Sequence, residues 1–331
     1  MSKINEIKAI YESNALVIRQ CAALLNNMPD FITEGAIAEI TGGNEGLEEY
    51  AFSFFLSSLF FEDDGEASKF HKEYYLKSVK KLNPNEYLEN PYYKNIKIPQ
   101  KSEGSWTLGV QTYKPYEAFI YNDLLVDGYR EIPRIGFFNK GFSYPTVFEN
   151  GVEWMAIKPN EIETMKKPIE DAFGNVAVFG LGLGYYAYMI SRKESVSSIT
   201  IIERDKNVIS LFNKYILPQF ENKHKIKIVE ADAFDFLEKS MEKEAFDFAF
   251  VDLWHDTSDG VELYIKARKL EGRDQKTKFF YWIERSILSS IRASLFNAIC
   301  AQIEDGKLTK TDEEMERILT DGYIKELVLH M

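Results

Sequence analysis

Three apolar runs in the second half of the chain end in acidic side chains, whose carboxylates can bind hydroxyl groups or take up a proton. Glu203 ends the run SSITIIE, Asp232 and Ala233 follow the run KIKIVEA, and Asp252 ends the run AFDFAFVD. A carboxylate beside a nucleophile can act as a general base, and one beside a ribose can accept its hydroxyl groups. These acids are the first candidates for a functional site.

The last of these runs continues as VDLWHD, which adds further groups that can contact a ligand. Asp252 is the best candidate for a general base or an anchor for a substrate amine, and His255 is the second. We predict that substrate is contacted by Trp254, Asp256 and Tyr185. For the two aromatic residues the reason is that an aromatic face attracts a cation by roughly 0.5–2 kcal/mol. Two structural alternatives stay open, with Asp252 as a helix cap and His255 as an exposed loop residue.

Three glycines precede these acids in the stretch VFGLGLGYY, at positions Gly180, Gly182 and Gly184. They lie where an apolar run ends and a helix-like segment begins, which is where glycine permits a ligand to approach the backbone and helix N–H groups. A tight strand-to-helix connection without a ligand would use the same residues. The neighbouring acids favour the binding interpretation.

The elements that must position these residues alternate strictly from about Phe173 onward. Such alternation predicts βαβ crossovers and a doubly wound, mostly parallel α/β sheet, and the strand runs are apolar throughout, as expected for strands buried on both faces. The carboxyl ends of all strands then meet at one edge, with the candidate residues on it. The predicted strands are 175–180, 197–203, 225–231, 245–253 and 278–284, and the predicted helices are 184–193, 206–220, 233–242, 258–271 and 285–302.

The N-terminal part is expected to be helical up to about Leu82 and to contain a β-hairpin farther on. Asn150-Gly151 is a strong two-residue hairpin signal, and Asn160 with Glu163 has the spacing of a capping box that starts a helix. We therefore predict an accessory, substrate-recognising domain over 1–155 and a cofactor-binding domain over 156–331. One apolar stripe at helical spacing is predicted to pack against a core, formed by Leu47, Tyr50, Ala51, Phe54, Phe55 and Leu59.

Composition narrows the classes of partner. The chain has 52 acidic and 40 basic side chains and a formal net charge of -12, which argues against a dedicated nucleic-acid binder. Cys21 and Cys300 have no metal-ligand spacing, so no metal site is predicted and a cytoplasmic location is expected. The most apolar window, AFSFFLSSLFF, is too short to span a bilayer, so no membrane partner is expected. A homodimer is left open.

The motifs VFGLGLG, ITIIERD, EADAFDFL and FDFAFVDLW together resemble the class I S-adenosylmethionine-dependent methyltransferases, within them the spermidine-synthase-like branch. The resemblance covers about Asn175 to Trp254 and implies a Rossmann-like methyltransferase fold that binds S-adenosylmethionine. It implies that the glycine loop lies under the methionine part of the cofactor and that Glu203 binds the ribose. It also implies that Asp232 and the backbone of Ala233 bind the adenine.

The leading expectation is an S-adenosylmethionine-dependent methyltransferase acting on a small molecule. An aminopropyl- or aminocarboxypropyltransferase uses the same framework and is the alternative enzyme. A non-catalytic binding module is a third hypothesis, because Val178 and Leu183 stand where the family usually has acids. The spacing Gly182-x-Gly184-x-x-Ala187 followed by Glu203 also fits the pattern of a dinucleotide-binding enzyme. Such an enzyme has no standard role for an acid at Asp232.

Overall fold

The computed structural model describes residues 3–271 and 276–330, and it contains two compact units. The first comprises Met1–Tyr87 with Thr112–Ser143, and the second comprises Leu88–Gln111 with Tyr144–Met331. The predicted division into a substrate-recognising domain over 1–155 and a cofactor-binding domain over 156–331 concerns what each part binds. It stays a prediction.

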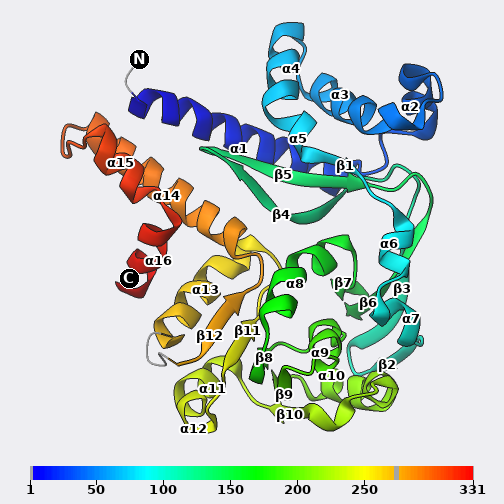
Figure 1. Cartoon of the computed structure of the whole chain (residues 1–331). Coiled ribbons are helices and arrows are strands. Elements are labelled where there is room, and N and C mark those ends of the chain that lie inside the picture. The colour runs from blue at the N-terminus through cyan, green and yellow to red at the C-terminus, as the bar shows by residue number, and fades with distance from the viewer. Residues whose placement is uncertain (1–2, 272–275, 331) are drawn as a thin grey trace. The chain divides into compact units, whose positions relative to one another are not determined.

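The first unit combines helices with a small three-stranded sheet (Figure 1). In this sheet β5 lies between β1, which is parallel to it, and β4, which is antiparallel. The N-terminal region is thus mainly helical, as predicted, with a short strand at its end. The elements are α1 (Lys3–Asn27), α2 (Glu34–Thr41), η1 (Glu45–Leu47), α3 (Glu48–Phe60), α4 (Asp64–Phe70), η2 (His71–Tyr75), α5 (Leu76–Ser78), β1 (Val79–Lys81), α6 (Pro84–Leu88), β4 (Phe119–Asp127) and β5 (Arg130–Phe137).

Helix α3 buries a different face from the predicted one. Leu47, Tyr50 and Phe54 are exposed, whereas Phe52 is fully buried and stacks on Phe137 with ring centroids 4.4 Å apart. The helix is apolar on most of its circumference, so helical spacing alone does not select the face that packs. The stripe prediction is therefore wrong for three of its six residues.

The second unit contains the predicted parallel sheet, and the α/β fold class is confirmed. Its strand order is β10-β9-β8-β11-β12, and every neighbouring pair is parallel. The strands are β8 (Gly174–Phe179), β9 (Val196–Glu203), β10 (Ile226–Glu230), β11 (Phe248–Val251) and β12 (Lys278–Tyr281). The helices and short turns among these strands are α8 (Pro159–Asp171), α9 (Tyr185–Ser191), α10 (Lys206–Leu211), η3 (Phe212–Ile216), η4 (Leu217–Gln219), η5 (Lys223–Lys225), α11 (Ala233–Lys239), α12 (Met241–Glu244) and α13 (Thr257–Glu271).

The register of this sheet brings the strand ends together. Phe179 at the end of β8 pairs with Ile202 on one side and with Val251 on the other, and Glu203 pairs with Glu230. The chain order reverses at β8, because β9 and β11 flank it. Ligands of open α/β sheets bind outside the carboxyl ends of the strands at such a reversal. The glycine loop follows β8 at this position.

A second, antiparallel sheet has the order β2-β3-β6-β7. Its β6–β7 hairpin turns at Asn150 and Gly151, which both have positive φ (51° and 81°), as a type I′ turn requires. The hairpin prediction is confirmed. The strands are β2 (Lys101–Glu103), β3 (Trp106–Tyr113), β6 (Phe142–Glu149) and β7 (Val152–Ala156), and α7 (Pro91–Asn95) precedes them.

Three helices end the chain, α14 (Glu284–Glu304), α15 (Asp312–Ile318) and α16 (Asp321–His330). Helix α14 is long and apolar enough to cross a membrane, but a buried core helix can be equally long and apolar. Helix α14 contacts α13 and α16, and its buried Arg292 forms an ion pair with Asp321. These contacts are those of a helix packed within a protein.

Candidate functional site

A cavity of about 410 Å³ lies at the carboxyl ends of the parallel strands in the second unit. Nine of the eleven predicted site residues line it, whereas Gly184 and Asp256 do not. Gly184 is the N-cap residue of α9, and Asp256 lies in the exposed segment before α13. The nine residues are Gly180, Gly182, Tyr185, Glu203, Asp232, Ala233, Asp252, Trp254 and His255.

The glycine loop passes close to the end of β11. A Cβ atom on Gly180 would lie 2.2 Å from the carbonyl oxygen of Asp252, and this residue has a φ of +99°, so only glycine fits without a backbone shift. A Cβ atom on Gly182 (φ +48°) would lie 3.2 Å from the side chain of Met155. The glycines thus allow this close packing, and both line the cavity.

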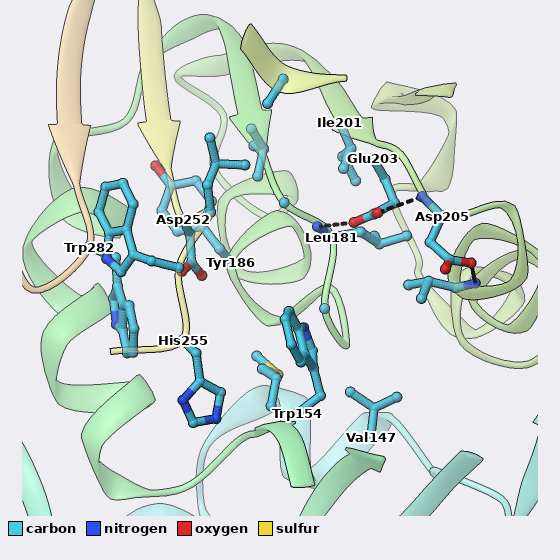
Figure 2. Close-up of a pocket in the computed structure, with 18 of the residues that line it drawn as sticks. Val147, Trp154, Leu181, Tyr186, Ile201, Glu203, Asp205, Asp252, His255 and Trp282 are labelled. Carbon is cyan, nitrogen blue, oxygen red and sulfur yellow. Dashed lines mark hydrogen bonds between the residues drawn. The ribbon is translucent and has the colours of Figure 1, made fainter. Parts of the chain in front are cut away.

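Glu203 is held by backbone N–H groups. One of its oxygens, Oε2, accepts a hydrogen bond from Leu181 N at 3.2 Å, and Oε1 accepts one from Asp205 N at 2.8 Å (Figure 2). Each carboxylate oxygen can accept a second hydrogen bond. The carboxylate is thus oriented and still able to bind a hydroxyl group.

Asp205 extends this network to Trp106, a tryptophan that is not among the predicted site residues. Its Oδ1 caps α10 by accepting hydrogen bonds from Asn207 N and Val208 N, and its Oδ2 accepts one from Trp106 Nε1 at 2.9 Å. Trp106 lies on β3, about a hundred positions earlier, and also lines the cavity. No local sequence signal connects these two residues.

Asp232 is the N-cap of α11. Its Oδ1 accepts hydrogen bonds from Phe234 N at 2.9 Å and Asp235 N at 3.1 Å. Ala233 begins this helix and is buried. A cap that uses one carboxylate oxygen keeps the other available to a ligand.

Asp252 directly follows β11, and its backbone N–H is fixed by a hydrogen bond to Phe179 O at 2.9 Å. Helix α13 begins only at Thr257, so Asp252 is not its cap. Within residues 3–271 and 276–330, its carboxyl group has no hydrogen bond or ion pair. Burial raises the pKa of Asp252 to about 7.

Glu161 is a buried carboxyl group in the same cavity as the half-buried Asp252, and no sequence pattern indicated it. It lies in the first turn of α8, is 6% exposed and likewise has no side-chain hydrogen bond or ion pair to any part of the chain that the structure describes. Burial and the charge of Asp252 raise its pKa well above the ordinary value. The predicted capping box is wrong, because Lys158 is the N-cap residue, without a side-chain cap, and Pro159 begins the helix.

The aromatic residues of the site differ in their polar contacts. Trp254 is 5% exposed and stacks on Tyr281, and its Nε1 is buried with no hydrogen-bond partner among the described residues. The hydroxyl group of Tyr185 accepts a hydrogen bond from Asn90 at 3.0 Å, and burial raises the pKa of Tyr185 to about 12. Both rings thus line the cavity as parts of the core.

His255 and Asp256 lie at the exposed rim. The backbone N–H of His255 donates to Asp259, and the ring of His255 lies 5.9 Å from that of Trp154. Oδ1 of Asp256 accepts a hydrogen bond from Ser258 N at 2.6 Å near the start of α13. The predicted roles of His255 in catalysis and of Asp256 in substrate binding stay predictions.

The cavity is strongly acidic. Among its described lining residues, eight are acidic and two are basic, so a cationic ligand is favoured. No group of three or more metal-ligating side chains occurs among the residues that the structure describes. The charged lining residues are Glu149, Glu153, Glu161, Glu203, Asp205, Asp232, Asp252, Asp259, Lys158 and Arg204.

Residues 162–272 match the family model of the spermine/spermidine synthase domain. This segment contains the glycine loop and the acids after β9, β10 and β11. No curated protein sequence matches the chain. The domain match covers about a third of the chain.

Two solved structures illustrate the similarity. One is a spermidine synthase in complex with the transition-state analogue AdoDATO, at 19% identity and a TM-score of 0.33, with 41% of this chain and 50% of that chain covered. Another is spermidine synthase from Thermotoga maritima, at 16% identity and a TM-score of 0.33, with 45% and 54% covered. The chain spans about half the length of each.

The domain match corrects the functional expectation. The match is to a spermine/spermidine synthase domain and not to a methyltransferase, so the leading expectation of a methyltransferase is wrong. The resemblance to the spermidine-synthase-like branch is supported, and the alternative enzyme of the sequence analysis is favoured.

Proposed function

We propose that this protein transfers an aminopropyl group from decarboxylated S-adenosylmethionine to an amine acceptor. The match of residues 162–272 to the spermine/spermidine synthase domain carries the proposal, because this segment supplies most of the cavity's predicted binding residues. The acidic lining adds support, since amines are cations near neutral pH.

The nucleoside part of the donor would bind at the glycine loop. Gly180 and Gly182 line the cavity, Glu203 is held by backbone N–H groups and can still accept hydroxyl groups, and Asp232 keeps one oxygen for the adenine with the backbone of Ala233. These groups fit an adenosine with unmodified ribose hydroxyls. The bound donor would supply a carbon activated by a sulfonium for attack by an amine.

The charge of the cavity favours the decarboxylated donor over intact S-adenosylmethionine. A donor carboxylate would need a cationic partner, and only Lys158 and Arg204 among the described lining residues are basic. Lys158 is already paired with Glu153 at 2.7 Å. Aminopropyl transfer is therefore proposed over aminocarboxypropyl transfer.

Asp252 is proposed as the general base for the acceptor amine. An ammonium group must lose a proton before its nitrogen can attack, and a base with a pKa near 7 suits that transfer near neutral pH. The cavity walls would align the amine with the donor carbon and exclude water.

Product analysis tests this proposal. The purified protein is incubated with decarboxylated S-adenosylmethionine and a panel of diamines and polyamines, and the nucleoside products are separated by chromatography. We expect methylthioadenosine together with an aminopropylated amine. Absence of methylthioadenosine with every acceptor would overturn the proposal.

Two controls sharpen the assay. Intact S-adenosylmethionine with the same acceptors should give neither S-adenosylhomocysteine nor methylthioadenosine above background. Asp252→Asn should lose product formation, whereas Glu230→Gln, on the neighbouring strand end and outside the cavity lining, should retain it.

A further inference from the structure

Two carboxyl groups from different elements face the same cavity without a partner. Asp252 comes from the end of β11 and Glu161 from the first turn of α8, and both line the cavity. Burial and the charge of Asp252 both raise the pKa of Glu161. Glu161 lies just outside the segment that matches the synthase domain.

Such an arrangement is costly when both groups are charged. A buried carboxylate without a hydrogen bond or counter-ion is strongly disfavoured, and two neighbouring carboxylates resist ionising together. Burial and this mutual repulsion therefore favour the protonated forms, and the two protons leave in steps that belong to the pair. An ammonium group placed between them would remove this cost.

The surroundings do not already supply that counter-charge. Lys158 lowers the pKa of Glu161 and Glu153 raises it, and these two are bound to each other at 2.7 Å. The unpartnered Nε1 of the buried Trp254 also belongs to this cavity. Other titratable groups that line the cavity on neighbouring elements are Tyr185 and Tyr186 on α9, His255 before α13 and Asp259 on α13. Helix α8 also carries Glu163, Lys166, Lys167, Glu170 and Asp171, which do not line the cavity.

We propose that Glu161 and Asp252 together form the ammonium-binding end of the cavity, and that a cationic amine displaces a proton from this pair when it binds. This inference rests on the proposed function, because it takes the amine acceptor as the ligand. The displaced proton passes to solvent, and the two carboxylates then share the positive charge of the amine. Glu161 is thus a substrate-binding residue contributed from outside the matched segment.

Calorimetry tests the exchange without requiring turnover. 1,4-Diaminobutane is titrated into the full-length protein in buffers of equal pH and different ionisation enthalpy, with 1,4-butanediol as the uncharged comparison. We expect proton release on binding of the diamine and none with the diol. Between about pH 6 and 8 the affinity should rise with pH, by up to about tenfold per unit for each proton released.

Variants locate the exchange. Glu161→Gln should reduce the proton release, because only Asp252 remains to exchange a proton, and should weaken diamine binding by about 10- to 100-fold, as expected for loss of a charge-assisted contact. Glu149→Gln removes one negative charge from the same cavity lining and should leave the proton release intact. Thermal unfolding verifies that both variants are folded.

The outcomes separate this inference from the proposed function. Proton-linked diamine binding that depends on Glu161, without methylthioadenosine formation, would support the ammonium site and overturn the aminopropyl transfer. Methylthioadenosine formation with diamine binding that shows no buffer dependence, or the same dependence in Glu161→Gln, would overturn the ammonium site alone.

Discussion

The carboxyl groups at the two ends of the cavity differ in their hydrogen bonds. At the end formed by β9 and β10, Glu203 and Asp232 accept hydrogen bonds from backbone N–H groups. At the other end, Glu161 and Asp252 have none within the described part of the chain. Hydrogen bonds to a carboxylate favour its charged form, whereas burial without them favours the protonated form.

This difference matches the chemistry that we assign to each end. A ribose or adenine requires acceptors whose direction is fixed before binding, and backbone N–H groups fix them. An amine requires a group that can exchange a proton, and an unpaired buried carboxyl group provides it. The four predictions below test this contrast, from the largest expected effect to the smallest.

Asp252→Asn should have the largest effect, because it removes the proposed base while keeping its shape. We expect aminopropyl transfer to fall by roughly 10²–10⁴, the usual range for a positioned acid–base group. Methylthioadenosine affinity, measured by calorimetry, should stay within about threefold, because the nucleoside end is untouched. A large loss of nucleoside affinity would show that the two ends are not separate.

Glu203→Ala should weaken nucleoside binding by about 10- to 100-fold, since charge-assisted hydrogen bonds contribute roughly 1.5–3 kcal/mol. It also removes the acceptor for Leu181 N and Asp205 N. Glu230→Gln is the matched control, as Glu230 pairs with Glu203 in the sheet and is exposed. Equal affinity in wild type and Glu203→Ala would refute the ribose assignment.

The fold was largely predictable because its signals are local. The βαβ alternation, the glycine loop and the Asn150-Gly151 turn each lie within a short segment, and the structure has all three. The buried face of α3 was not predictable, because apolar residues surround that helix and only its tertiary partners select a side. The choice between methyl and aminopropyl transfer was also open, since both use one framework.

The site was predictable where residues follow strand ends, and not where they come from elsewhere. Glu161 was missed because the Asn160–Glu163 spacing suggested a capping box, whereas Pro159 begins the helix. With that start, Glu161 is buried against the cavity and Glu163 is not. Trp106 was missed because its contact with Asp205 spans almost a hundred positions.

The carboxyl pair, Glu161 and Asp252, should also make the free energy of unfolding depend on pH. The folded pKa values of Glu161 and Asp252 are raised, so between about pH 4 and 7 the folded state binds more protons than the unfolded state. The free energy of unfolding should therefore fall as pH rises through this window, by up to about 1.4 kcal/mol per pH unit for each proton.

Urea denaturation of wild type and Glu161→Gln at several pH values in this window isolates the contribution of the pair. The variant should lose less stability with rising pH, because the substituted amide cannot ionise and Asp252 then lacks an acidic neighbour. Parallel pH profiles for the two proteins would mean that Glu161 is charged in the folded state.

Trp106→Phe should have the smallest effect, because it acts on the nucleoside end through one intermediate residue. It removes the 2.9 Å hydrogen bond from the indole Nε1 to Asp205 Oδ2 but keeps an aromatic ring on β3. A neutral donor bound to a carboxylate contributes about 1 kcal/mol or somewhat more, so methylthioadenosine affinity should fall by about three- to tenfold. Asp205 would still cap α10 and still donate its N–H to Glu203, so the loop should keep its conformation.

The pH dependence of diamine binding in Trp106→Phe should be the same as in wild type, since the proton exchange belongs to Glu161 and Asp252. If Trp106→Phe instead alters proton release on diamine binding, the two ends of the cavity are coupled through β3, and the contrast between a fixed end and a proton-exchanging end no longer holds.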